Sequence, residues 1–187
     1  MKPETILRDV IDPSLRFLNA TLGGGPATTD LARVGLLAIA GQEAGWKQRR
    51  QVGGPARSYW QFESGGGVAG VMTKPSTGAM LAKVCAALDI PFDRPTIFEA
   101  MAWNDCLAVV MARLLLYSDP APLPAIGEQD LMWNYYRRNW RPGKPHLEAW
   151  PAYYGAAVAA VLAAPPIHNP MPGQLGPGPP VEPEPTR

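Results

Sequence analysis

Apolar residues recur at helical spacing along most of the chain, and clusters of glycine and proline separate the segments in which they do so. No stretch combines strand-like alternation with hairpin turns, although 58–62 has the composition for a brief pairing with a neighbouring segment. The pattern therefore predicts an all-α domain. Its helices are expected over about 3–22, 28–43, 76–88, from 96 onward, 104–117, 128–140 and 146–163.

Residues with special backbone preferences indicate where these helices begin, bend and end. Thr28 or Thr29 is the expected N-cap of the second helix, and Ser76 that of the helix after the glycine-rich loop. Pro13 predicts a bend or a division of the first helix, because proline has no backbone N–H to donate. Gly45 is the expected terminator of the second helix.

Composition divides the chain into one domain, 1–164, and a proline- and glycine-rich tail, 165–187. With 187 residues, of which 47% are hydrophobic, the chain has enough apolar material for a sizeable core. The tail cannot bury enough apolar surface to offset its ordering entropy, so we expect it to be extended. It is interpreted either as a terminus without a role or as an arm that docks on a partner.

Charge and residue counts exclude several function classes. A net charge of +1 argues against nucleic acid as the main partner. The first 22 residues mix charged and apolar side chains, so we expect no secretory signal, and no run of about eighteen apolar residues predicts a membrane span. Cys85 and Cys106 are interpreted as free thiols in helices, and two histidines offer little material for a metal site. We expect no cofactor.

Glu43 is the first candidate for chemistry. Leu36, Leu37 and Ile39 continue an apolar stripe that leads to it, so its carboxyl should lie beside a buried face. A carboxyl partly removed from water resists ionisation, and its pKa should rise toward neutrality, as a general acid requires. The alternative is an ordinary solvated glutamate in the last turn of the helix.

The segment after Glu43 carries a resemblance to a known family. Glu43-Ala44 is followed, after a loop, by Gly54-Pro55-Ala56-Arg57-Ser58-Tyr59-Trp60-Gln61. This order resembles the goose-type lysozyme and soluble lytic transglycosylase superfamily, particularly the small lysozyme-like proteins of tailed bacteriophages. There a helix ends in Glu-Ser, and Gly-Ala-x-Gly-Leu-Met-Gln follows. The resemblance implies a lysozyme-like helical fold, with Glu43 as catalytic acid and Gln61 at the border of the sugar site.

Aromatic and amide side chains are the expected sugar contacts. In the transglycosylases, Ala-Tyr-Asn-Ala-Gly places a tyrosine close to the acid, and Tyr135 or Tyr136 is the equivalent by order along the chain. Asn104 either caps the helix that follows it or faces the cleft. Sugars present apolar C–H faces that aromatic rings contact. The set expected to wall a cleft is Trp46, Tyr59, Trp60, Trp133, Tyr135, Tyr136 and Trp140.

A second carboxylate decides between two mechanisms. Glycosidases with two carboxylates hold them roughly 5 Å apart when retaining and roughly 6.5–9.5 Å apart when inverting. Glu63 is the nearby candidate, and it either faces Glu43 or forms an ion pair with Arg57 or another arginine of the loop, which we expect. Arg49, Arg50 and Arg57 either give this loop a positive field that can orient anionic peptidoglycan or are solvated side chains that pair with neighbouring acids.

The resemblance implies a phage-encoded enzyme that cleaves the β-1,4 bond between N-acetylmuramic acid and N-acetylglucosamine, as a lysozyme or a lytic transglycosylase. The expected partners are the peptidoglycan glycan strand and, through the tail, other virion proteins. The expected location is the virion of a tailed phage acting in the host periplasm, or the host cytoplasm before lysis. The competing hypothesis is a catalytically inactive virion structural protein with a lysozyme-like fold.

Overall fold

The computed structural model describes residues 1–26 and 28–167. Helix covers 64% of the described residues, which form no β-strand, and this confirms the all-α prediction. Of the predicted tail, 165–187, only 165–167 are described; they are not helical, and the rest lies outside the described residues. The elements are α1 (Pro3–Ile6), η1 (Leu7–Ile11), α2 (Asp12–Leu22), α3 (Asp30–Ala44), η2 (Ser64–Val68), α4 (Ala69–Thr73), α5 (Pro75–Ala87), α6 (Arg94–Ala100), α7 (Asp105–Tyr117), α8 (Gln129–Trp140), η3 (Leu147–Ala149) and α9 (Trp150–Ala163).

The first predicted helix is continuous but irregular. α1, η1 and α2 follow one another without a break, and η1 is a π-helical turn that ends just before Asp12-Pro13. Proline cannot donate the usual helical hydrogen bond, and a wider turn ahead of it relieves the steric conflict with the preceding carbonyls. The predicted irregularity at Pro13 is therefore present. Gly23, with a φ of 63°, ends α2 in the left-handed conformation.

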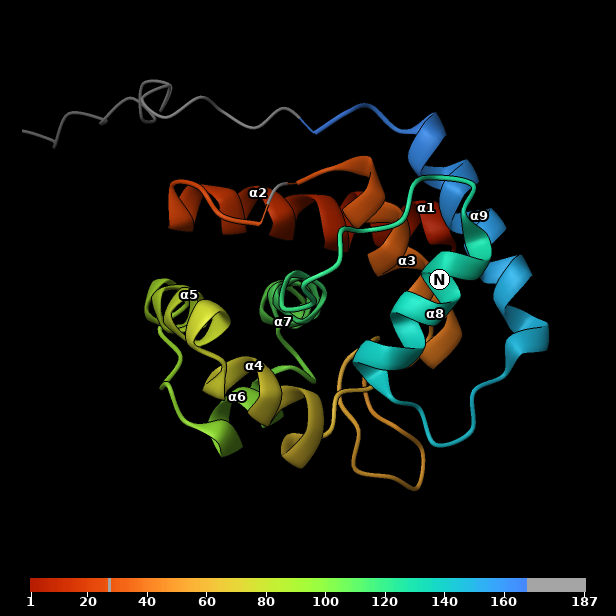
Figure 1. The fold of residues 1–187 in the computed structure, drawn as a ribbon. Helices are drawn as coiled ribbons and strands as arrows, with labels where there is room; N and C mark the ends of the chain where they lie inside the picture. The colour runs from red at the N-terminus through yellow and green to blue at the C-terminus, as the bar shows by residue number, and fades with distance from the viewer. Residues whose placement is uncertain (27, 168–187) are drawn as a thin grey trace, which may run out of the picture.

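Helix α3 lies at the centre of one half of the molecule, with α1, α8 and α9 around it (Figure 1). Thr29 caps it by accepting a hydrogen bond from the Ala32 amide at 3.2 Å, and Gly45 ends it at a φ of 55°. Both ends match the predictions. The run 32–41 is buried throughout, so this helix is enclosed on every side, and all but Arg33 in the run are apolar residues or glycines.

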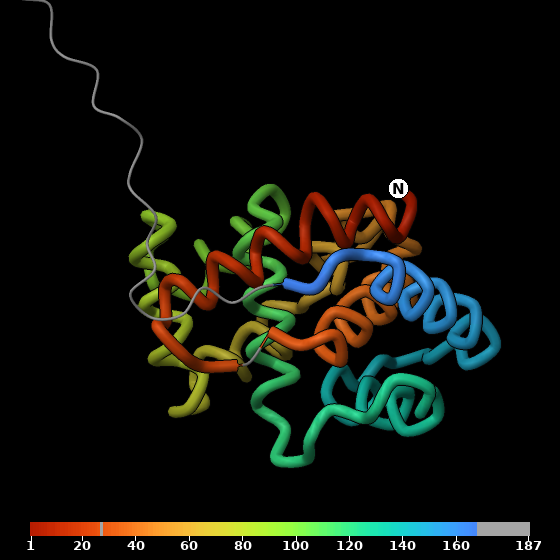
Figure 2. The backbone as a smooth tube through the Cα atoms, turned by 90° about the horizontal axis from the view of Figure 1, so that it is seen from above, coloured from red at the N-terminus to blue at the C-terminus, as the bar shows by residue number. Residues whose placement is uncertain are grey.

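Close approach of α9 explains a second glycine in α3. A Cβ placed on Gly41 would lie 2.6 Å from the Tyr153 ring and 2.8 Å from the Trp46 ring. Both views of the fold show α9 running beside α3 (Figures 1 and 2). A larger residue at position 41 would push these elements apart.

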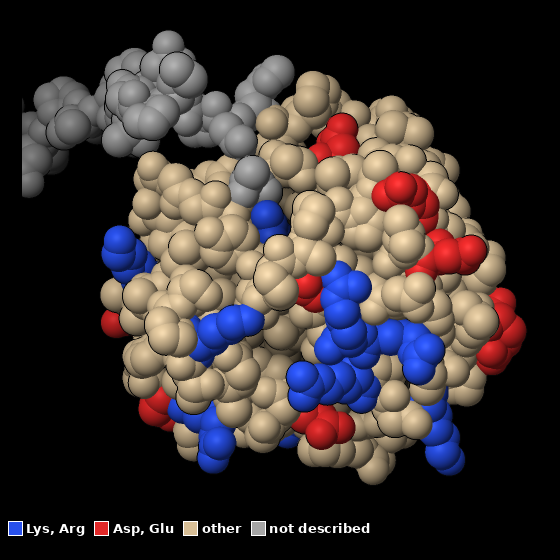
Figure 3. Space-filling model, viewed as in Figure 1, with Lys and Arg blue, Asp and Glu red and all other residues tan. Residues whose placement is uncertain are grey.

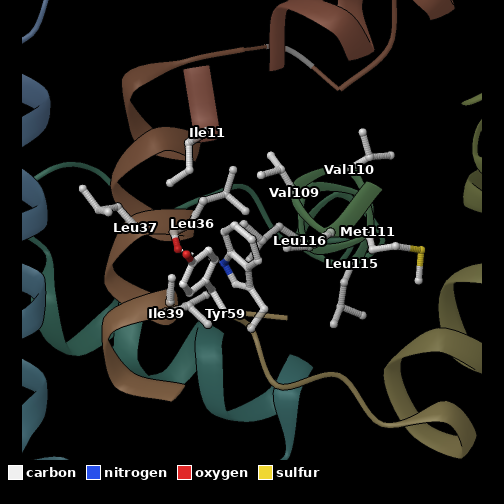
Figure 4. Packing of buried hydrophobic residues seen from close by; sticks show 14 of the residues in the cluster. Ile11, Leu36, Leu37, Ile39, Tyr59, Val109, Val110, Met111, Leu115 and Leu116 are labelled. Carbon is white, nitrogen blue, oxygen red and sulfur yellow. Dashed lines mark hydrogen bonds between the residues drawn. The ribbon is translucent and has the colours of Figure 1, made fainter. Parts of the chain in front are cut away.

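Helix α7 is the second fully buried helix, and it packs against α2 and α5. Side chains of α3, such as Leu36, face those of α7, such as Val109 and Leu116, with Tyr59 packed among them (Figure 4). The two apolar helices and the loop residues between them form one core. This core holds the end of α3 and the following loop in place.

Two predicted helix starts are wrong. Helix α5 begins at Pro75, with Lys74 as its N-cap residue, so Ser76 lies inside the first turn rather than at the cap. Proline suits this first position because its missing N–H has no helical partner there. Helix α6 begins before Thr96, because the Asp93 carboxylate accepts a hydrogen bond from the Thr96 amide at 2.9 Å.

A buried ion pair ties the first helix to α3. Arg33 is 1% exposed and donates two hydrogen bonds to the Asp12 carboxylate, at 2.9 and 2.7 Å. A third bond, at 2.9 Å, reaches Asp30. Every charge in this group has an oppositely charged partner.

Within the described residues, no single helix has both the length and the apolar composition needed to cross a membrane. Helices α6 and α7 meet the length and composition criteria only when taken together, and this pair is bent by 115°.

Candidate functional site

The loop after α3 is held by three ion pairs and two backbone bridges. Arg49 binds Asp105 at 2.7 Å, and Arg57 binds Glu99 at 2.8 Å. Arg57 also exchanges backbone hydrogen bonds with Phe62, at 2.9 and 2.8 Å, so the predicted brief pairing of 58–62 exists as isolated bridges rather than as a strand. The loop is therefore fixed against α6 and α7, and the residues after it are placed with precision beside the end of α3.

Glu43 lies in the last turn of α3, largely buried, and its Oε1 accepts a hydrogen bond from the Tyr136 hydroxyl at 2.6 Å. Burial raises the pKa of Glu43 from 4.5 to about 7. The Tyr136 hydrogen bond lowers it and the negative charge of Glu63 raises it, both to a smaller extent. The predicted rise of this pKa is confirmed. A carboxyl with this pKa is available as a proton donor at neutral pH.

Glu43 and Tyr136 line a groove with a volume of about 730 Å³. Gln61, Glu63 and Trp140 line it too, so the structure brings together five of the residues that the sequence singled out. The opposite ends of this set are 97 positions apart in sequence, and α3, the loop and α8 deliver them to one place. The remaining lining residues are Gln42, Gln51, Ala56, Phe62, Gly65, Gly66, Gly67, Ala69, Gly70, Thr73, Leu115, Arg141, Pro142, Gly143, Lys144 and His146.

The two tyrosines of α8 have different surroundings. Tyr136 reaches Glu43, whereas the Tyr135 hydroxyl donates to the Leu116 carbonyl at 2.7 Å. Successive residues of a helix point in different directions, so only one of the pair can face the groove. The choice left open by the sequence falls on Tyr136, and Tyr135 belongs to the core.

Most of the aromatic residues expected in the cleft lie behind it instead. Tyr59 and Trp60 are both 0% exposed, and the Trp60 indole donates to the Leu36 carbonyl at 2.9 Å. Neither lines the groove, so their prediction as sugar contacts is wrong. The rings of Tyr59 and Trp60 fill the space between α3 and α7. They therefore anchor the loop to α3.

The other expected aromatics also serve mainly in packing. Trp46 packs edge-on against Tyr153, and Trp133 packs against Tyr136. Trp150, which the sequence did not single out, stacks on Tyr136 with 5.6 Å between ring centroids and 8° between ring planes. Trp140 does line the groove, and its indole donates to the Trp60 carbonyl at 2.9 Å. Trp133, Trp140 and Trp150 pack on the Tyr136 ring and so hold its hydroxyl against Glu43.

Asn104 caps α7 and is not a groove residue. Its side-chain oxygen accepts a hydrogen bond from the Leu107 amide at 2.9 Å. Its prediction as a substrate contact is wrong, and the alternative of a capping residue is confirmed.

Glu63 is exposed and lines the groove, and the expected ion pair with a loop arginine is absent from the described residues. Arg57 and Arg50 both bind Glu99, while Arg49 binds Asp105. Glu63 instead acts on Glu43 through its charge. The three arginines therefore stabilise the loop, and they do not line the groove.

Three features of the groove were not predicted from the sequence. Gln42 donates to the His146 carbonyl at 3.0 Å, while its buried Oε1 has no hydrogen-bond partner among the described residues. Gln51 is a further amide in the wall. The third is the run 65–70, where a Cβ added at Gly65 or Gly70 would meet nothing within 4 Å. The repeated glycines of this run were a sequence signal for a groove wall, because larger side chains there would narrow the groove.

Metal and thiol chemistry have little support in the described part of the chain. No three of its His, Cys, Asp and Glu residues are grouped as a metal site. Cys85 and Cys106 are free, and burial raises the pKa of the Cys85 thiol to about 11, which keeps it protonated.

Comparison of the chain with protein-family models, with curated proteins and with solved structures found no match. The resemblance described above therefore rests on the sequence motifs alone.

Proposed function

We propose that this chain is a phage lysozyme-like protein that cleaves the β-1,4 bond between N-acetylmuramic acid and N-acetylglucosamine in peptidoglycan, with Glu43 as the general acid. The proposal rests on the environment of the Glu43 carboxyl. It is largely buried, has a pKa of about 7, and lies on a groove large enough for a saccharide. The sequence motifs of Glu43 and Gln61 supply the substrate class.

The groove offers a saccharide both polar and apolar contacts. Gln42, Gln51 and Gln61 provide amides in the groove wall for hydroxyl and acetamido groups. Trp140 packs edge-on against the buried Phe62 in the wall and provides apolar surface for a sugar C–H face.

The reaction begins when the Glu43 carboxyl gives its proton to the glycosidic oxygen. The bond from that oxygen to C1 of the muramic acid breaks, and the resulting Glu43 carboxylate is stabilised by the Tyr136 hydroxyl. In a transglycosylase, this carboxylate then takes the proton of the sugar's 6-hydroxyl while the 6-oxygen bonds to C1. Glu43 is protonated again, and the product ends in an anhydro ring.

Hydrolysis is the second possible outcome of the same first step. A water then attacks C1, and it needs a second base at a defined separation from the acid. Glu63 lines the same groove and has no ion-pair partner among the described residues, so it is the residue that would activate this water. The products of the two routes differ by one water in mass.

The delivery of the protein rests on the resemblance. We place it in the virion of a tailed phage, acting on the wall in the host periplasm, with other virion proteins as partners of the tail. Release from the host cytoplasm before lysis is the other route.

The deciding experiment is the clearing of a suspension of outer-membrane-permeabilised Gram-negative cells. We expect the full chain to clear it, and Glu43→Gln to lose activity by about 10²- to 10⁴-fold. Glu4→Gln is the matched control, because Glu4 is exposed and lies outside the groove. Equal clearing by the full chain and Glu43→Gln would remove Glu43 from its role. No clearing by either, with the chain recovered from purified particles, would favour a structural virion protein.

A second variant tests the groove without touching the acid. Gly70→Phe places a ring in the groove wall, where an added Cβ meets nothing within 4 Å. We expect clearing to be lost while the thermal unfolding midpoint stays close to that of the parent. Gly155→Phe, at an exposed position of α9 that also has open space around it, is the control. Full activity in Gly70→Phe would mean that the glycan does not use this groove.

A further inference from the structure

The groove beside Glu43 does not end there. A second hollow of about 430 Å³ adjoins it, and the two share part of one wall. The shared residues are Gly66, Gly67, Gly70, Leu115 and Arg141. A ligand longer than the site of bond cleavage can therefore continue past Arg141 into this extension.

Charge is unevenly distributed along the two hollows. Glu43, Glu63 and Lys144 line the first hollow, Arg141 lies at the junction, and Lys74, Arg138 and Asp119 line the extension. Figure 3 shows Lys and Arg side chains concentrated on the face that carries the C-terminal end of α8. Since the whole chain has a net charge of only +1, this concentration is local. The basic residues are Lys74, Arg138, Arg141 and Lys144.

Two of these four cations are already engaged. Arg138 binds the Asp119 carboxylate at 2.6 Å, and Lys74 donates to the Ser118 carbonyl. Arg141 and Lys144 form no ion pair with any described residue, and the one side-chain hydrogen bond of Arg141 to this part of the chain is a 3.4 Å contact from Nε to the Arg138 carbonyl. Both cations are exposed on the groove.

The position of Arg141 at the C-terminus of α8 does not explain why this residue is an arginine. This residue has a φ of 50°, in the left-handed region where glycine is favoured. Basic residues also stabilise a helix C-terminus through its dipole, but Arg137 and Arg138 already lie in the last turn of α8. An arginine at this position keeps a guanidinium at the junction of the two hollows, where a glycine would have ended the helix at lower steric cost.

We propose that Arg141 and Lys144 form an anion site that binds the carboxylates of the substrate's lactyl-peptide side chain. The inference rests on the proposed function and specifies its substrate: a glycan strand that still carries peptide stems. The sugars of the strand are neutral apart from this side chain, so paired cations on the groove distinguish peptidoglycan from uncharged N-acetylglucosamine polymers. Binding there also sets which sugar ring lies beside Glu43.

Binding to the full chain carrying Glu43→Gln tests the site without cleavage. Three tetrasaccharides are compared by isothermal titration calorimetry at low salt: one with peptide stems, the same one after removal of the peptides, and one of N-acetylglucosamine alone. We expect affinity to fall in that order, with about a five- to tenfold difference between the first and the last. Added salt should reduce the difference, because exposed charges are screened.

Adding Arg141→Gln and Lys144→Gln to this protein should make the three affinities equal. Adding Arg16→Gln and Lys83→Gln removes the same charge from exposed positions outside both hollows and should leave the order unchanged. Retention of the order without Arg141 and Lys144, or equal affinities before their removal, would overturn the anion site while leaving the proposed function intact. Binding of none of the three, together with no clearing by the parent chain, would overturn both.

Discussion

The two ends of α3 each bury a charged side chain, but in different surroundings. Near the start, Arg33 forms a charge pair with Asp12 and a second one with Asp30. Near the end, Glu43 accepts one hydrogen bond from the described residues, that of the uncharged Tyr136 hydroxyl, and the charge that acts on its pKa, that of Glu63, has the same sign. The first environment neutralises the buried charge of Arg33, and the second disfavours the ionised form of Glu43.

This difference distinguishes a buried charge that stabilises the fold from a buried carboxyl that is suited to proton transfer. A paired charge is stable in its ionised form, and it holds the elements that provide the partners. An unpaired carboxyl lowers its free energy by keeping its proton, which raises its pKa and leaves that proton available to a ligand. One helix thus combines a fixed attachment at one end with a site suited to proton transfer at the other. Four predictions test this distinction.

Asp12→Ala should cause the largest loss of stability. It leaves the buried guanidinium of Arg33 with only the half-exposed carboxylate of Asp30, and removal of one partner from a buried pair costs about 3–5 kcal/mol. Urea denaturation followed by circular dichroism measures this free energy of unfolding. Asp9→Ala, which removes the exposed partner of Arg8, should leave it unchanged. Similar values for both variants would contradict the stabilising role of the α3 pair.

The pH dependence of stability should reveal the opposite behaviour of Glu43. Its pKa is about 7 in the folded protein and about 4.5 in the unfolded chain, so between these values only the folded state holds the proton. The free energy of unfolding should therefore fall as the pH rises from 4.5 to 7, by about 3 kcal/mol from this group. Below pH 4.5 both states are protonated and the effect vanishes.

Glu43→Gln should abolish this part of the pH dependence, because its amide does not titrate. The difference in unfolding free energy between parent and variant, measured across pH 4 to 8, isolates the contribution. A difference that does not change with pH would show that the pKa of Glu43 in the folded protein lies near its ordinary value.

Tyr136→Phe should lower activity and move its pH dependence. The hydroxyl stabilises the carboxylate, so its loss should raise the pKa of Glu43 and shift the decline of activity at high pH to higher pH. We expect kcat to fall by about 10- to 100-fold, since a hydrogen bond to a charged group is lost. Tyr135→Phe is the matched control, because its hydroxyl binds the Leu116 carbonyl. It should reduce stability and leave the pH profile in place.

Glu63→Gln should have the smallest effect. Removing its negative charge should lower the pKa of Glu43 and shift the decline of activity to slightly lower pH, and less so in high salt. Glu99→Gln, which loses contacts to Arg57 and Arg50 outside the groove, should not move the profile. A loss of activity comparable to that of Glu43→Gln would instead assign Glu63 as the base of a hydrolytic reaction.

Local signals in the sequence determined the helices and the position of the acid. Apolar spacing, together with Thr29 and Gly45, predicted the extent of α3, because a helix start and stop depend on neighbouring residues. The same stripe predicted that Glu43 would be buried and hard to ionise. Ser76 failed as a cap because Pro75 starts the helix one residue earlier.

Tertiary structure alone decided which side chains meet. Sequence spacing does not distinguish Tyr135 from Tyr136, and their roles follow from the rotation of α8 against α3. Tyr59 and Trp60 have the composition of a sugar platform, yet the space between α3 and α7 takes them into the core. Arg141 enters the groove only through the direction in which α8 ends. Such contacts join residues far apart in the chain, so they depend on how whole helices pack and not on any local pattern.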